Sequence, residues 1–148
     1  KGFLTLVIDS DVIRKGLNRD LGYSEEDRHE NLRRVAEMAK IMVNTGIIVI
    51  VSFISPTNFS REQARQIIGS DDTIILYVNA PLNVCEKRDV KGLYAKARQG
   101  LIPMFTGIDS PYEEPRNYDL EIKTHMLTVD ESVEKITEFV LPHIKYKG

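Results

Sequence analysis

The chain has 148 residues, of which 42% are hydrophobic and 28% charged, and this size and composition are typical of a globular domain with one core. Its net charge of −2 does not indicate binding to nucleic acid or to an anionic membrane, and no apolar run approaches the roughly 20 residues of a membrane span. A single cysteine excludes an internal disulfide, so we expect a protein of the reducing cytoplasm.

Three short apolar runs predict strands that are buried on both faces, because each is rich in Ile, Val and Leu and is bounded by polar residues or glycine. They are FLTLVI (residues 3–8), GIIVIVSF (46–53) and TIILYV (73–78), and LEIKT (120–124) is a weaker fourth candidate.

Helical patterns lie between these runs. Ser24 is expected to cap a long amphipathic helix that Gly46 ends. Ser60 and Gly69 are expected to cap and end a shorter helix in the same way.

Two prolines mark the remaining helices. Pro81 is expected to open a helix at its first turn, and the amphipathic helix over residues 128–144 is expected to be interrupted or to end near Pro142. Strands that alternate with helices predict an α/β domain with a mostly parallel sheet. Ligands of such sheets bind beyond the carboxyl ends of the strands.

Two carboxylates, Asp9 and Asp11, follow the first predicted strand. A pair of acids can hold Mg²⁺ or accept a proton from an attacking hydroxyl group. If the next helix begins near Asp11, Arg14 and Asn18 share one helix face, from which the arginine can bind a phosphate or sulfate group. From these residues alone, an aspartate N-cap with a surface ion pair is the alternative interpretation.

Further candidates are weak when taken one at a time. Arg28 and Asn31, at the start of the second helix, either hold an anion or belong to a solvated face. FISP (53–56) either offers backbone groups to a nucleobase or is a tight turn. The basic segment with Arg88 and Lys91 is either a lid over phosphates or an exposed loop. No histidine has a partner at metal-ligand spacing, so a zinc site is not expected.

The order of these segments is more specific than any one of them. The order begins with DSDVIRKGLNRDLGYS, EDR, EN and RR. Next comes FISP, then RDVKGLYAKARQG, and then FTGIDSPYE. Together they closely resemble the adenosine 5′-phosphosulfate (adenylylsulfate) kinases, from about residue 5 to residue 140. The resemblance implies a doubly wound, three-layer P-loop kinase fold with a parallel sheet. It also implies transfer of the ATP γ-phosphate to the 3′-hydroxyl of adenylyl sulfate in sulfate assimilation, with ATP and Mg²⁺ as cofactors.

The resemblance also implies which residues bind adenylyl sulfate. Phe105 and Tyr23 are implied to stack on the two sides of its adenine, and tyrosine in place of the family's phenylalanine should keep this stacking. The arginines are implied to hold the phosphosulfate group. The full set of residues expected to contact adenylyl sulfate is Arg14, Asn18, Tyr23, Arg28, Asn31, Ile54, Ser55, Lys91 and Phe105.

The remaining implied roles concern catalysis and ATP. Asp9 and Asp11 are expected to be the catalytic acids, with Asp9 as a Mg²⁺ ligand, directly or through water. Arg88 is expected to lie over the ATP adenine. A lid over about residues 89–106 is expected to close over the reaction.

Two features depart from the family pattern. Ser10 replaces the glycine of the family motif DGD, which is compatible only if this residue does not need a positive φ. The phosphate loop G-x-x-x-x-G-K-[ST] does not occur in the sequence. We therefore interpret residues 1–148 as a kinase domain without its N-terminal strand, phosphate loop and helix, and we expect a gap in the sheet. Without that loop, catalysis by these 148 residues alone is in doubt.

Two alternative functions stay open. The first is a non-catalytic, kinase-like domain that senses nucleotide within a larger sulfate-activating protein. The second is a P-loop kinase for a nucleoside or a gluconate-like substrate, against which the FTGIDSPYE segment argues. The expected partners are ATP and adenylyl sulfate, a second copy in a homodimer, and ATP sulfurylase through fusion or association. No nucleic acid or membrane partner is expected.

Overall fold

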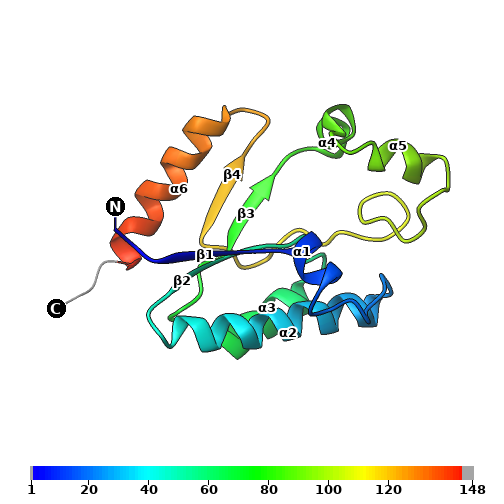
Figure 1. The fold of residues 1–148 in the computed structure, drawn as a ribbon. Helices are drawn as coiled ribbons and strands as arrows, with labels where there is room; N and C mark the ends of the chain where they lie inside the picture. Colours follow the sequence, from blue (N-terminus) through cyan, green and yellow to red (C-terminus); the bar gives the residue numbers. More distant parts are fainter. Residues whose placement is uncertain (1, 145–148) are drawn as a thin grey trace. The chain divides into compact units, whose positions relative to one another are not determined.

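The computed structural model describes residues 2–144, and the chain divides into two compact units, residues 1–73 and 74–148. Each unit combines two parallel strands with helices (Figure 1). No helix within residues 2–144 is long and apolar enough to cross a membrane.

The first unit pairs two strands that lie almost 40 residues apart in the sequence. The strands align in parallel from Thr5 opposite Ile48 to Asp9 opposite Ser52. Both lie inside apolar runs from which strands were predicted, so these predictions are confirmed. The elements of the unit are β1 (Thr5–Asp9), α1 (Ser10–Lys15), α2 (Glu25–Val43), β2 (Ile48–Ser52) and α3 (Asn58–Ile68).

Helix α2 provides most of the core of the first unit. Leu32, Val35, Ala36 and Ala39 are buried, and their spacing of three and four residues places them on one helix face. The helix packs against α3, beside which it lies in Figure 1, and against β2. The polar residues on its other side are thereby left for contacts outside the core.

The helix ends of this unit are only partly as predicted. Ser24 caps α2, since its hydroxyl group accepts a hydrogen bond from the Asp27 amide. The predicted Ser60 cap is wrong, because α3 begins at Asn58 and the Thr57 hydroxyl accepts the Ser60 amide. Both hydroxyl residues suit a cap, but the earlier one is used and Ser60 is buried inside the helix.

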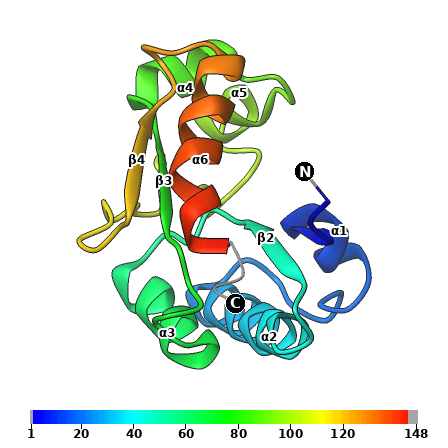
Figure 2. The same ribbon diagram turned by 90° about the vertical axis from the view of Figure 1, so that its left-hand side faces the viewer.

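The second unit also has a pair of parallel strands, aligned from Leu76 opposite Leu120 to Asn79 opposite Lys123. Both strands were predicted, and Tyr77 and Ile122 form their buried centre. Figure 2 shows this unit with α6 running alongside the strands, and α6 packs against β4. Its elements are β3 (Leu76–Asn79), α4 (Leu82–Arg88), α5 (Leu93–Arg98), β4 (Leu120–Lys123) and α6 (Val129–Ile144).

The prolines behave differently at the two helices. Pro81 is the N-cap of α4, one position before the predicted first turn. The helix α6 is not interrupted at Pro142, because it continues through this residue to Ile144, the last residue that the structure describes. A proline removes only one amide donor from a helix, and this one lies within the last turn that the structure describes.

The four strands do not join into one sheet. They form two separate two-stranded sheets, β1 with β2 and β3 with β4. The prediction that these residues alone do not complete a fully paired sheet is therefore confirmed. Within residues 2–144 each strand has a single pairing partner, so a second edge of each strand has no partner strand.

Candidate functional site

The two acids that follow β1 lie at the start of α1, and the first of them caps this helix. Asp9 is the N-cap, and its Oδ1 atom accepts hydrogen bonds from the amides of Asp11, at 2.8 Å, and Val12, at 3.4 Å. The N-cap interpretation of Asp9 is thus confirmed. Both acids are exposed, so a ligand can reach them. Ser10 is the first residue of α1 and is not among the non-glycine residues with positive φ, so its replacement of glycine causes no strain.

Arg14, Tyr23 and Arg28 form one cluster beside these acids in the first unit. The guanidinium carbon of Arg14 lies 4.6 Å from the centre of the Tyr23 ring, and its Nη1 donates to the Gly22 carbonyl oxygen at 2.7 Å. Arg28 donates from Nε to the Tyr23 carbonyl oxygen at 2.9 Å. Tyr23 is 62% exposed. An exposed aromatic residue with two cations bonded at its loop is suited to a ligand with a base and an anionic group.

A close approach of side chain to backbone fixes the turn that presents Tyr23. The Gly22 amide donates to Asp27 Oδ2 at 3.0 Å, and a Cβ atom at this glycine would lie 2.8 Å from the same oxygen. Any larger residue would displace the Asp27 carboxylate. The glycine therefore allows the first turn of α2 to hold the Tyr23 loop.

Asn18 and Asn31 lie in the interior of the first unit. Asn18 has no exposed surface and Asn31 is 3% exposed, and the Asn18 amide donates to Asn31 Oδ1 at 2.9 Å. The prediction that Asn18 shares a helix face with Arg14 is wrong, because α1 ends at Lys15. Asn18 therefore supports the fold in this structure, and its side chain is covered on all sides.

An ion-pair network that sequence reasoning missed joins this interior to the surface. Arg34 makes two hydrogen bonds to the Asp20 carboxylate, both 2.9 Å, and one to Glu30, and Arg33 makes two to Glu30. The hydrogen bonds from Arg33 and then Arg34 lower the pKa of Glu30 to about 2. The hydrogen bond from Arg34 also lowers the pKa of Asp20. Glu30 could have been anticipated from its helical spacing to the arginines, but Asp20 could not.

The FISP segment has an unusual backbone. Ser55 has a φ of 45°, a left-handed value that is uncommon for a non-glycine residue. The buried Arg61 of α3 donates to the Ser55 carbonyl oxygen and, at 2.9 Å, to Asn58 Oδ1. The guanidinium group thus secures a strained turn, and Ile54 before it is 65% exposed.

In the second unit, the basic segment begins with Arg88 and Asp89, which are hydrogen-bonded to different parts of the chain. Arg88 donates to the hydroxyl group of Thr124 at 3.0 Å and to its carbonyl oxygen at 2.7 Å. The Asp89 carboxylate accepts the amides of Tyr94 and Ala95, both at 3.0 Å, which lowers its pKa. Lys91 between them and α5 is exposed.

Phe105 opens a compact loop that is closed by its own hydrogen bonds. Its ring meets the Tyr94 ring edge to face, with 5.0 Å between the centres. Its carbonyl oxygen accepts three amides, those of Ile108, Asp109 and Ser110. The segment FTGIDSP is therefore an ordered turn that holds one aromatic side chain, rather than an extended loop.

The predicted site residues fall into both units. Asp9, Asp11, Arg14, Tyr23 and Arg28 lie in the first unit with FISP, and Arg88, Lys91 and Phe105 lie in the second. The prediction that all of them meet in one cleft stays a prediction.

The comparison with protein families decides the relationship. A sequence model described as adenylylsulphate kinase matches residues 1–123. The chain belongs to the adenylylsulphate kinase family. Adenylyl-sulfate kinases of Bacteroides thetaiotaomicron and Phocaeicola vulgatus are each 52% identical to it, over 99% and 100% of this chain and 73% and 72% of their own length.

Solved structures agree with this family membership. The chain is similar to the Mycobacterium tuberculosis APS kinase CysC in complex with AMPPNP and APS, with 43% identity and a TM-score of 0.86. This match covers 95% of the chain and 82% of that structure. The α/β fold with parallel strands is thus the P-loop kinase fold, as predicted.

The metal that the family implies was tested against the acids present. Residues 2–144 contain no group of three or more histidine, cysteine, aspartate or glutamate side chains that could enclose an ion. Mg²⁺ in phosphoryl-transfer enzymes is commonly bound by one or two carboxylates and the substrate phosphates. The exposed pair of Asp9 and Asp11 fits this kind of site.

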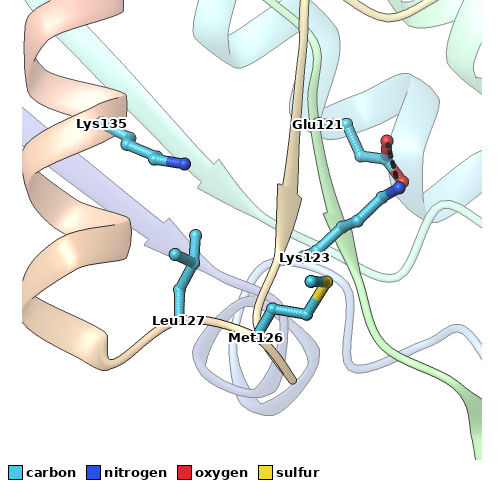
Figure 3. Close-up of a pocket in the computed structure, with 5 residues that line it drawn as sticks. All are labelled: Glu121, Lys123, Met126, Leu127 and Lys135. Atoms are coloured by element: carbon cyan, nitrogen blue, oxygen red, sulfur yellow. Dashed lines mark ion pairs between the residues drawn. The ribbon is translucent and has the colours of Figure 1, made fainter.

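One pocket in the second unit is not formed by predicted site residues. It has a volume of about 320 Å³ and lies between β4 and α6. Figure 3 shows Lys123 paired with Glu121, at 3.8 Å, and Lys135 on the facing helix. Its lining residues are Glu121, Lys123, Met126, Leu127 and Lys135.

Proposed function

We propose that the protein transfers the γ-phosphate of ATP to the 3′-hydroxyl group of adenylyl sulfate and so takes part in sulfate assimilation. The observation that carries this proposal is the cluster in which Arg14 lies over the ring of the exposed Tyr23 and Arg28 is bonded to its backbone carbonyl oxygen. It combines an aromatic face with two cations, which complements a nucleotide with an anionic tail, and it occurs in a chain of the adenylylsulphate kinase family.

Adenylyl sulfate is proposed to bind with its adenine between Tyr23 and Phe105. Arg14 and Arg28 donate hydrogen bonds to the Tyr23 loop, which places both cations beside it, and a guanidinium group can bind the anionic phosphosulfate group. Ile54 and Ser55 are proposed to present backbone groups to the base, and Lys91 is proposed to contact the substrate. Asn31 and Asn18 are proposed to act indirectly, since both are buried and hydrogen-bonded to each other.

Asp9 and Asp11 are proposed to receive the proton of the attacking 3′-hydroxyl group and to orient it. Phosphoryl transfer requires mainly in-line positioning and neutralisation of charge, so few reacting side chains are needed. Mg²⁺, if held by these carboxylates, supplies neutralisation of charge on the transferred phosphoryl group. One oxygen of Asp9 also caps α1, so replacing Asp9 would disturb the backbone as well as the reaction.

The ATP side of the site is proposed to involve Arg88, near the adenine, and a lid over residues 89–106. The 148 residues contain no G-x-x-x-x-G-K-[ST] segment. We propose that a strand, a phosphate loop and a helix outside this numbering complete the kinase domain. Two observations support this: each described strand has one edge without a partner strand, and the chain spans 71–75% of the length of five curated relatives that it matches.

The setting of the enzyme is proposed from the same resemblance. A cytoplasmic location suits a chain with one cysteine, and a homodimer and an association or fusion with ATP sulfurylase are proposed as its assemblies. Sedimentation of the full-length protein, alone and with ATP sulfurylase, tests both assemblies.

An assay of ATP-dependent conversion of adenylyl sulfate by the full-length protein tests the proposed function. We expect 3′-phosphoadenylyl sulfate and ADP in equal amounts. Binding of these nucleotides without turnover would instead identify a sensing domain. Phosphorylation of a nucleoside or of gluconate, with adenylyl sulfate unchanged, would identify a different P-loop kinase.

A further inference from the structure

The loop from Met104 to Ser110 is held by a carboxylate that neither the motif nor the fold assigns to a task. Asp109 Oδ2 accepts the Met104 amide at 2.7 Å, and its Oδ1 accepts the Phe105 amide. The Asp109 amide in turn donates to the Phe105 carbonyl oxygen at 3.2 Å. Both polar backbone groups of Phe105 are thus bonded to the same residue.

Other contacts make this arrangement rigid around Phe105. Met104 has a φ of 58°, a conformation that a non-glycine residue keeps only when its surroundings hold it. The Gly107 amide donates to the Ser110 carbonyl oxygen at 2.7 Å, which closes the loop from the far side. The Phe105 ring is then placed edge to face against Tyr94.

We infer that Asp109 is a positioning residue for adenylyl sulfate, which acts by fixing the backbone that carries the Phe105 ring. A stacking side chain binds a base well only if its plane is set before the base arrives, because ordering it during binding costs conformational entropy. The carboxylate has two acceptor oxygens and fills both with adjacent amides, so it determines the direction of the Cα–Cβ bond of Phe105. This inference rests on the proposed stacking of Phe105 on the substrate adenine.

The inference predicts a dependence of one residue on the other. Asp109 is exposed and is expected to contribute to substrate affinity only through Phe105. Asp109→Asn keeps the shape of the side chain but presents an N–H₂ group to one of the two amides, so one hydrogen bond is lost. Removal of Phe105 should therefore abolish the effect of Asp109→Asn.

The experiment measures the dissociation constants of adenylyl sulfate and of a non-hydrolysable ATP analogue for the full-length protein, together with KM, kcat and the thermal midpoint. The variants are Phe105→Ala, Asp109→Asn and the double variant. Asp130→Asn is the control, because it removes the same charge from an exposed position of the second unit. Base–aromatic stacking is worth about 1–3 kcal/mol per base, so Phe105→Ala should weaken adenylyl sulfate about 5- to 150-fold.

We expect Asp109→Asn to weaken adenylyl sulfate binding, but by a smaller factor than Phe105→Ala does. The affinity for the ATP analogue, kcat and the thermal midpoint should stay close to those of the control. In the Phe105→Ala background, Asp109→Asn should change adenylyl sulfate affinity by less than about twofold. Independent effects that multiply in the double variant would overturn the inference. The inference would also be overturned if Phe105→Ala weakened adenylyl sulfate binding while Asp109→Asn left it unchanged. If the wild-type protein does not bind adenylyl sulfate at all, the proposed function itself fails, and the inference fails with it.

Discussion

The side-chain amide of Asn18 donates a hydrogen bond to the side-chain oxygen of Asn31, and both residues lie in the interior of the first unit. A buried acceptor that loses its donor costs about 1–3 kcal/mol. Asn18→Ala should therefore lower the free energy of unfolding by about this amount, as measured by urea denaturation of the full-length protein. Asn83→Ala, at an exposed position of α4, is the control. Equal stability of the two variants would show that the Asn18–Asn31 pair contributes little.

The ion-pair network around Glu30 predicts a pH dependence of stability. Its pKa is about 2 in the folded protein and 4.5 ordinarily, so the folded state favours the charged form. The stabilising contribution is complete above about pH 4.5 and is lost as the pH falls from there towards about 2. The difference in unfolding free energy between wild type and Glu30→Gln should thus shrink between pH 6 and pH 3. Since Glu30 is one-third exposed, solvent will reduce the size of the effect.

Glu37→Gln is the matched control for this measurement. Glu37 lies on the same helix and approaches Arg33 only to 3.8 Å, so its replacement should have a smaller effect. A difference between wild type and Glu30→Gln that stays constant over this pH range would contradict the proposed role of the carboxylate charge.

Replacement of Asp11 tests the assignment of the acids. If Asp11 acts on the attacking hydroxyl group, Asp11→Asn should lower kcat by about 10²- to 10⁴-fold while KM for adenylyl sulfate changes little. Steady-state kinetics of the full-length protein measure both constants, with Asp71→Asn as an exposed control. A normal kcat would leave Asp9 as the only candidate base in this pair.

Gly107 has a left-handed backbone conformation, so we expect a side chain at this position to be destabilising. Its φ is 88°, and a left-handed conformation costs a residue with a Cβ atom about 1–2 kcal/mol. Gly107→Ala should destabilise the second unit by about this amount and should weaken adenylyl sulfate, because the loop carries Phe105. The comparison is Gly107→Asn at the same position, because asparagine visits the left-handed conformation more readily than alanine does. Equal thermal midpoints for the two variants would argue against strain at Gly107.

The predicted lid can be tested by amide hydrogen exchange without ligand. Amides in residues 89–106 should exchange faster than those of α2, and they should slow when ATP analogue and adenylyl sulfate are both bound. The Tyr94 and Ala95 amides should be the slowest of the segment, since the Asp89 carboxylate accepts both. Exchange throughout the segment as slow as in α2 would mean that it is not a lid.

Much of the fold could be predicted because its determinants are local. The four strands follow from short apolar runs, and the Ser24 cap follows from a hydroxyl residue directly before a helical pattern. The Thr57 cap was missed because Ser60, three residues later, is an equally good capping residue by type. Only the course of the chain after Ser55 decides between them.

The contacts that support the expected site residues could not be predicted from the sequence. Motif order indicated Arg14, Tyr23, Arg28 and Phe105, and the structure brings the first three together. The pairing of Asp20 with Arg34 joins residues 14 positions apart across a turn, which no periodic pattern reveals. Asn18 was placed wrongly because the end of α1 at Lys15 depends on how the following turn packs.

Arg88 and Asp89, two consecutive residues, join three elements of the second unit. Arg88 is bonded to Thr124 beyond the end of β4, and the Asp89 carboxylate accepts amides at the start of α5. The Asp89 amide also donates to the Cys85 carbonyl oxygen of α4 at 3.0 Å, and Arg98 of α5 is paired with Glu86 of α4 at 2.6 Å. Helix α5 is therefore tied to α4 at both of its ends. Any movement of α5 away from α4 would have to break both the Arg98–Glu86 pair and the hydrogen bonds of Asp89.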